Sequence, residues 1–75
     1  MPHLHIKLIE GKTEEQKQQL AEAVMKAAQS IIGFGDESYS VAVEDFTREE
    51  WKSDVYPHQI MGRKDILKKE PGYTM

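Results

Sequence analysis

The residue of this sequence with the most distinctive chemistry is Pro2, which directly follows Met1. Methionine aminopeptidases usually remove an initial methionine before a small residue such as proline, and the chain would then begin with a secondary amine. Burial or a nearby cation would lower the pKa of that amine and leave it partly neutral near pH 7. A neutral amine can take a proton from a carbon next to a carbonyl and return it elsewhere. The structural alternative is that Pro2 only opens an edge strand, where its missing N–H does no harm.

Such a proton-transfer site also needs groups that bind a substrate, and a few side chains could supply them. Lys12 could attract a carboxylate, although a solvated loop lysine is the simpler explanation of this residue alone. Arg48 and Arg63 are the only arginines, and either could bind a carboxylate through two hydrogen bonds. The spacing of these residues does not indicate which of them would do so. Trp51 could form the wall of a pocket for an apolar or aromatic substrate, with ordinary core packing as the alternative.

The composition gives little support to metal or nucleic-acid chemistry. No cysteine is present, which excludes disulfides, thiolate ligands and cysteine catalysis. His3, His5 and His58 could bind zinc, but they form no helical i, i+4 pair and no carboxylate motif accompanies them. A polar sheet face or a subunit contact explains them better, and we expect no metal site. Ten basic and 13 acidic residues give a formal net charge of −3, which argues against a nucleic-acid partner.

The length of 75 residues leaves room for a single domain over residues 1–75. No apolar run of about 18 residues is present, and the first residues lack the apolar stretch of a signal peptide. We therefore expect a cytoplasmic protein with no membrane partner. A domain this small buries only about 60% of the surface that its unfolded chain exposes. Without disulfides, self-association is the leading way to stabilise it.

Alternation of apolar and polar residues predicts two strands, over residues 2–9 and 39–44. A helix between them would make a β-α-β unit with parallel strands. Parallel strands begin at the same edge of a sheet, so we expect Tyr39 near Pro2. Lys12 follows the far end of the first strand, on the order of 25–30 Å from Pro2 if the path stays extended. It could therefore serve the Pro2 of a partner chain more readily than its own.

The helix between the strands has clear start and stop signals. Thr13 and Gln16 form a capping box, and Gly33 is a plausible C-cap, so the spacing predicts a helix over 14–32. The same periodicity places Lys17 on the solvent side of this helix.

A second capping box, at Thr47 and Glu50, predicts a short helix that Pro57 ends or separates from another. Two parallel strands and one long helix leave strand edges and a sheet face open. We therefore predict an α+β fold, a small β-α-β protomer with parallel strands that is completed by homo-oligomerisation. A symmetric dimer or a higher closed oligomer would follow.

Several segments, taken together, resemble the 4-oxalocrotonate tautomerase family, and above all its longer PptA-like subgroup. Pro2 is followed by HLHIKLIEGKTEEQKQQLAEAV, which is similar to the first strand, turn and helix start of that family. The stretch YSVAVE, which begins at Tyr39, resembles its second strand. From Trp51 to Tyr73 the chain is similar to the PptA-like members, so the likeness covers nearly the whole sequence.

The resemblance implies an oligomeric β-α-β protein that catalyses keto–enol tautomerisation of 2-oxo acids without a cofactor. The catalytic proline of the family maps onto Pro2. Its first carboxylate-binding arginine maps onto Lys12, which keeps the charge but loses the bidentate geometry. Its second arginine maps onto Ala42, which puts dicarboxylate substrates in doubt. By the same resemblance, Trp51 replaces the aromatic residue of the family's active site. The PptA-like tail implies a dimer, whereas the shorter members of the family form hexamers.

Our hypothesis from the sequence is a cofactor-free isomerase that interconverts the enol and keto forms of a small 2-oxo acid, more specifically a monocarboxylate. Pro2 would move the proton, and Lys12, Trp51, Tyr39, Arg48 and Arg63 are the candidates for binding the substrate. Related hydratase or dehalogenase chemistry is one alternative, because the same proline could protonate a substrate after water adds. A non-catalytic oligomeric binding module of the same fold is the other.

Overall fold

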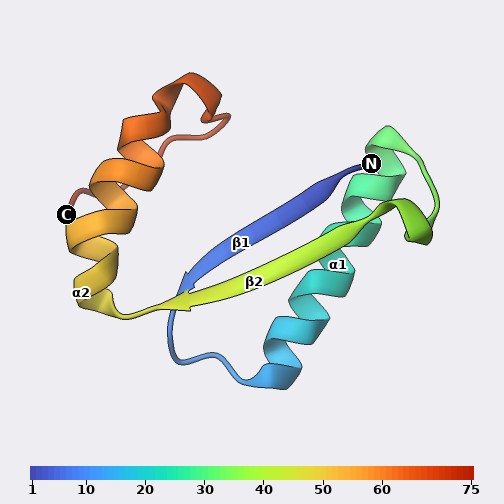
Figure 1. Cartoon of the computed structure of the whole chain (residues 1–75), viewed down its shortest axis with the longest axis horizontal. Coiled ribbons are helices and arrows are strands. Elements are labelled where there is room, and N and C mark those ends of the chain that lie inside the picture. The colour runs from blue at the N-terminus through green and yellow to red at the C-terminus, as the bar shows by residue number, and fades with distance from the viewer. The chain divides into compact units, whose positions relative to one another are not determined.

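A computed structural model describes residues 1–75, which form two compact units, Met1–Asp45 and Phe46–Met75. The first unit contains β1 (His3–Ile9), α1 (Glu14–Ile32), the 3-10 turn η1 (Asp36–Ser38) and nearly all of β2 (Ser40–Phe46) (Figure 1). The second contains α2 (Arg48–Glu50), the π-helix η2 (Trp51–Ile60) and the 3-10 segment η3 (Met61–Ile66). None of these helices combines the length and apolar character that crossing a membrane requires.

The first unit is the predicted β-α-β arrangement, with β1 and β2 as the two parallel strands of one sheet (Figure 1). The amide of Ser40 donates to the carbonyl of Pro2 over 3.3 Å, which sets the start of the two strands side by side. Apolar side chains of both strands, Leu8 and Val41 among them, line hollows together with side chains of α1. One face of the sheet is therefore directed toward α1, as the alternation of residues predicted.

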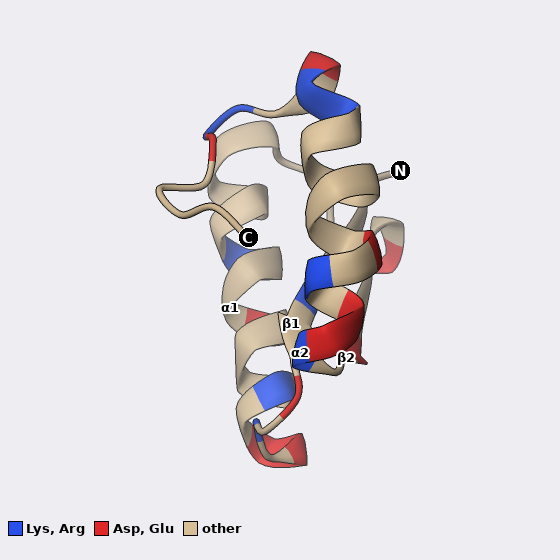
Figure 2. Cartoon of the chain, turned by 90° about the vertical axis from the view of Figure 1, so that its left-hand side faces the viewer, with Lys and Arg blue, Asp and Glu red and all other residues tan.

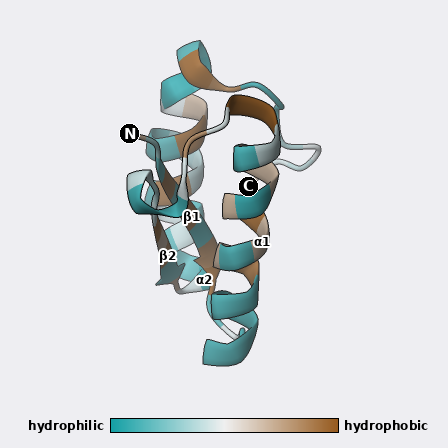
Figure 3. Ribbon diagram, turned by 90° about the vertical axis from the view of Figure 1, so that its right-hand side faces the viewer, coloured by the Kyte–Doolittle hydropathy of each residue, from teal (hydrophilic) through white to brown (hydrophobic).

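Helix α1 begins and ends where its sequence signals predicted. The Gln16 amide donates to the Thr13 hydroxyl over 3.0 Å, and the Thr13 amide donates to the Gln16 side chain over 2.9 Å. At the other end Gly33 has a φ of 82°, and its amide donates to the Gln29 carbonyl. Only glycine adopts such a left-handed conformation without strain. The N-terminal turns are hydrophilic throughout (Figure 3), which suits an exposed helix start.

The first unit has no fully buried residue, although it carries an apolar helix stripe and two apolar strands. Near the C-terminal end of α1, Ile31 is 82% exposed, and Ile32 and Phe34 are exposed too. Large apolar side chains gain stability when they leave water. This unit therefore keeps apolar surface that its own elements do not cover.

The second unit begins with the predicted capping box. The Glu50 amide donates to the Thr47 hydroxyl over 3.0 Å, and the Thr47 amide donates to the Glu50 side chain over 2.7 Å. Acidic residues occupy the first turns of both α1 and α2 (Figure 2), where they complement the positive end of the helix dipole.

The expectation that Pro57 ends this helix or starts another is wrong, because Pro57 lies inside the π-helix η2. Proline lacks an N–H, and its ring collides with the carbonyl four residues earlier in an α-helix. In the wider π-helix that carbonyl is no longer the partner of residue 57, and the Met61 amide, for example, donates to the carbonyl of Tyr56, five residues earlier. Val55, in the same segment, is the one fully buried side chain of the chain.

Candidate active site

Pro2 stands at the entrance to β1, at one end of the sheet. Its side chain is half-buried, and its carbonyl accepts the hydrogen bond from Ser40. Met1 is fully exposed. Removing Met1 would therefore expose the Pro2 nitrogen without taking away any packed side chain.

Next to Pro2, two histidines occupy the sheet face that points away from α1. Nδ1 of His3 lies 2.6 Å from the Ser40 hydroxyl, and Nε2 of His5 lies 2.8 Å from a Glu44 carboxylate oxygen. The two rings meet edge to face, with 6.1 Å between their centroids. Each histidine is thus bound to β2, which matches a polar sheet face. No group of three or more His, Cys, Asp or Glu side chains could hold a metal ion.

Lys12 lies at the opposite end of the first unit, in the turn between β1 and α1. Gly11 precedes it with a φ of 123°, and the capping residue Thr13 follows it. The side chain of Lys12 is exposed and makes no ion pair within the chain. It borders a hollow of about 210 Å³, whose lining residues are Leu8, Lys12, Gln16, Lys17 and Leu20. A cation beside apolar side chains suits a small organic anion.

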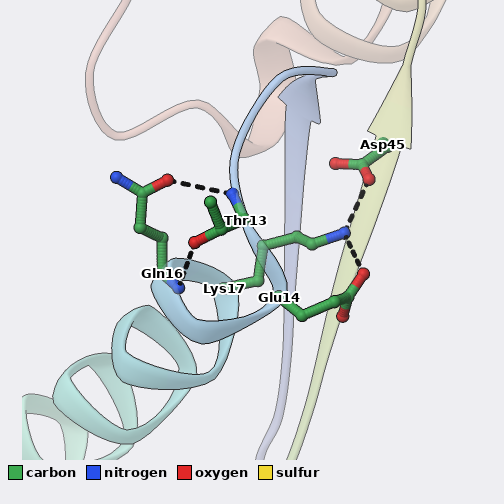
Figure 4. Close-up of polar contacts among 5 residues, drawn as sticks. All are labelled: Thr13, Glu14, Gln16, Lys17 and Asp45. Atoms are coloured by element: carbon green, nitrogen blue, oxygen red, sulfur yellow. Dashed lines mark hydrogen bonds and ion pairs between the residues drawn. The ribbon is translucent and has the colours of Figure 1, made fainter.

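Lys17, a second cation, lines the same hollow but is held by carboxylates. Its ammonium group donates to Asp45 over 2.7 Å and to Glu14 over 2.9 Å (Figure 4). Only 15% of its side chain is exposed. The hydrogen bond to Asp45, followed by that to Glu14, raises the pKa of Lys17 above its ordinary value.

The expectation that Lys17 faces solvent is therefore wrong. Helical periodicity alone could not predict its partner, because Asp45 lies 28 residues further along the chain. A signal was nevertheless present in β2. Residues Tyr39, Val41, Val43 and Asp45 alternate along one face of the strand, so Asp45 carries the helix-facing series to its end.

Tyr39 directly precedes β2, and the next residue, Ser40, donates its amide to the carbonyl of Pro2. Its side chain is half-buried, and its hydroxyl donates to the carbonyl of Gly33 over 2.7 Å. It also borders a hollow of about 350 Å³ against Met25 of α1. In this arrangement the hydroxyl of Tyr39 holds the loop after α1.

The remaining candidates belong to the second unit. Trp51 is half-buried, donates its indole N–H to the Tyr73 hydroxyl over 3.2 Å, and meets Phe46 edge to face at 6.3 Å. Arg48 is exposed at the start of α2. Arg63 is paired with Asp65 at 3.3 Å, and this guanidinium lowers the pKa of the Asp65 carboxyl.

The two ends of β1 are too far apart for one chain to bring Pro2 and Lys12 together. Seven residues of strand separate them, which corresponds to about 23 Å at an extended rise of about 3.3 Å per residue (Figure 1). A lysine side chain spans only a fraction of that length. Within one chain the structure therefore provides a candidate proton carrier at one end and a candidate anion site at the other.

Comparison with known proteins identifies the family. A family model described as "Tautomerase enzyme" matches residues 2–58, so the match starts at Pro2. A "Probable tautomerase" of Xylella fastidiosa is 36% identical over 97% of this chain and 89% of its own. "Tautomerase PptA" of Pectobacterium carotovorum is 35% identical over 99% of both chains. A "2-hydroxymuconate tautomerase" of Bacillus subtilis is 33% identical over 68% of this chain and 82% of its own. The chain therefore belongs to the tautomerase family and is an isomerase.

Proposed function

We propose that this tautomerase interconverts the enol and keto forms of a small 2-oxo acid, with the amine of Pro2 as the proton carrier once Met1 has been removed. The observation that carries the proposal is the position of Pro2. It lies half-buried at the entrance to β1, directly after a fully exposed Met1. The match to the tautomerase family model, which begins at this residue, supports it.

The reaction requires one proton to change places. The neutral Pro2 amine would take the proton of the enol hydroxyl while the C–O bond becomes a carbonyl, and the ammonium would return a proton to the neighbouring carbon. The keto and enol forms have the same number of bonds to hydrogen, so the substrate is neither oxidised nor reduced overall. The isomerisation therefore needs no cofactor.

Lys12 is the cation that we propose for the substrate carboxylate. It is exposed, unpaired and placed at the edge of a partly apolar hollow, whereas Arg63 is already paired with Asp65. Ala42 offers no charge where the family resemblance places a second arginine. We therefore propose a monocarboxylate enol as the substrate. The name of the Bacillus subtilis relative, a 2-hydroxymuconate tautomerase, supports an enol acid as the substrate class.

The separation between Pro2 and Lys12 leads us to propose a shared site in a homodimer. A second copy with its first strand antiparallel would bring its Lys12 toward Pro2 of the first copy. It would also cover apolar surface that one chain leaves exposed. A hexamer built from such dimers is the alternative assembly, and sedimentation at micromolar concentration distinguishes a monomer, a dimer and a hexamer.

The test compares two preparations that differ only at the N-terminus, with intact mass as the check. Ketonisation of phenylenolpyruvate, followed by ultraviolet absorbance, should be fast for chains that begin at Pro2. Chains that retain Met1 carry an amide at this position and should be slower by a factor of about 100 or more, the usual worth of a positioned general base. Equal rates for the two preparations would rule out the Pro2 amine as the proton carrier.

A further inference from the structure

We infer that Asp45 determines how many negative charges a substrate of this enzyme can carry. Its carboxylate binds the ammonium group of Lys17, so this cation is not available to a ligand in the hollow that Lys17 and Lys12 both line. The inference rests on the proposed role of Lys12 as the cation for the substrate carboxylate. It adds a residue that neither the sequence motifs nor the family match assigns. With Asp45 in place the hollow offers one available cation, and without it the hollow would offer two.

The first step of the argument is that the two lysines border one hollow. Lys12 and Lys17 line it together with Leu8, Gln16 and Leu20. An anionic group held at Lys12 would thus lie in a small hollow that Lys17 also lines. Two lysines in one hollow would ordinarily suit a ligand with two negative charges.

The second step is that Lys17 is not available in the folded chain. Asp45, at the end of β2, and Glu14, in the first turn of α1, both accept hydrogen bonds from its ammonium group (Figure 4). The exposed fractions of the side chains are 15% for Lys17, 36% for Asp45 and 93% for Glu14. Lys12 has no such partner, so the two cations of the hollow differ in availability.

The third step is that Asp45 and Glu14 contribute unequally. Ion pairs between exposed groups are weak and easily exchanged for water, and Glu14 lies only three residues from Lys17 on the same helix. Asp45 is less exposed, gives the shorter contact and joins the helix start to the sheet. Asp45 is therefore the partner whose removal frees Lys17, while removal of Glu14 leaves the main contact intact.

The test uses two inert ligands that share a six-carbon diene skeleton. Sorbate carries one carboxylate, and trans,trans-muconate carries two. Their dissociation constants are measured by NMR titration of the amide signals of residues 11–20. The wild-type chain should bind muconate no better than sorbate. Asp45→Asn should bind muconate about fivefold tighter, the gain expected from one exposed ion pair, and should leave sorbate almost unchanged.

Matched variants separate this role from general effects. Glu15→Gln removes one negative charge from the same helical turn without touching Lys17 and should leave the ratio of the two constants as it is. Glu14→Gln should shift the ratio less than Asp45→Asn does. The double variant Asp45→Asn with Lys17→Met should lose the gain for muconate. A gain in selective affinity is a result that simple loosening of the fold would not produce.

An unchanged ratio in Asp45→Asn, or a gain that survives Lys17→Met, would overturn the inference. So would a lack of any shift at residues 11–20 with either ligand, because the hollow would then bind no carboxylate. These outcomes are separate from turnover of phenylenolpyruvate. A chain that binds as described but does not catalyse ketonisation would refute the proposed function and leave this inference standing. An active chain with no binding here would refute this inference and the carboxylate-binding role of Lys12, but not the role of the Pro2 amine.

Discussion

The two ends of strand β1 are built in different ways. At the Pro2 end the contacts are a backbone hydrogen bond to Ser40 and a side-chain hydrogen bond between His3 and the Ser40 hydroxyl. At the Lys12 end there are a capping box, an ammonium group that binds two carboxylates, and a hollow that Lys12 and Lys17 help to line. A proton carrier needs an amine that stays neutral, and an anion site needs fixed charge. In this β-α-β unit the candidate proton carrier and the candidate anion site therefore lie at separate ends.

After blockage of the Pro2 amine, removal of the Lys12 charge should have the largest effect on activity. Loss of a charged hydrogen-bonding group from a binding site costs about 1.5–3 kcal/mol, or roughly ten- to a hundredfold in binding. Lys12→Ala should therefore raise KM for phenylenolpyruvate by about tenfold or more, with a smaller change in kcat. Steady-state kinetics provides the measurement, and Lys26→Ala, a change at an exposed lysine of α1, serves as the control.

A fall in kcat with KM unchanged would place Lys12 in the chemical step instead of in carboxylate binding. No change in either constant would move the anion site to another cation, with Arg48 as the exposed candidate.

A smaller effect should follow from a charge added to the middle of β2. Ala42 lies on the sheet face opposite α1, where the family resemblance places an arginine. Ala42→Arg should improve kcat/KM for 2-hydroxymuconate relative to phenylenolpyruvate by about tenfold, or about 1.4 kcal/mol. The measurement is the ratio of the two specificity constants in the variant and the wild type. A wild-type enzyme that already prefers the dicarboxylate tenfold would contradict the monocarboxylate proposal.

The smallest effects should be those of single substitutions on the free energy of unfolding. They compare the stability of the two ends of β1. Thr13→Ala removes the N-cap of α1 at the Lys12 end and should lower the free energy of unfolding by about 1 kcal/mol. Ser40→Ala at the Pro2 end keeps the backbone hydrogen bond to Pro2 and should cost less, about 0.5 kcal/mol. Urea unfolding at one protein concentration measures both. A larger loss for Ser40→Ala would reverse our view of which end is more firmly held.

Local signals made most of the fold predictable from the sequence. Both capping boxes, the bounds of α1 and the Gly33 C-cap were correct, because each depends on residues within a turn of one another. The parallel strands followed from alternation and from the length of the helix between them. The path of the chain around Pro57 was not predictable, since a π-helix has no sequence signal comparable to a cap.

The candidate site was predictable to a lesser degree. Family resemblance indicated Pro2 and Lys12, and the expectation that they lie at opposite ends of the first strand is confirmed. The pairing of Lys17 with Asp45 was missed because helical periodicity describes one element at a time. A contact between the start of a helix and the end of a strand 28 residues later needs the register of both elements, which only the structure provides.

The claim that a catalytic site combines Pro2 of one chain with Lys12 of another can be tested by mixing two impaired proteins and measuring activity at a substrate concentration well below KM. One is a chain that retains Met1, and the other is a Lys12→Ala chain that begins at Pro2. Refolded together in equal amounts, half of the dimers should be mixed, and each mixed dimer should contain one intact site. Activity on phenylenolpyruvate should then return to about a quarter of the wild-type value at the same total concentration. Activity no higher than the mean of the two separate proteins, in a sample that mass spectrometry shows to contain mixed dimers, would contradict the shared site.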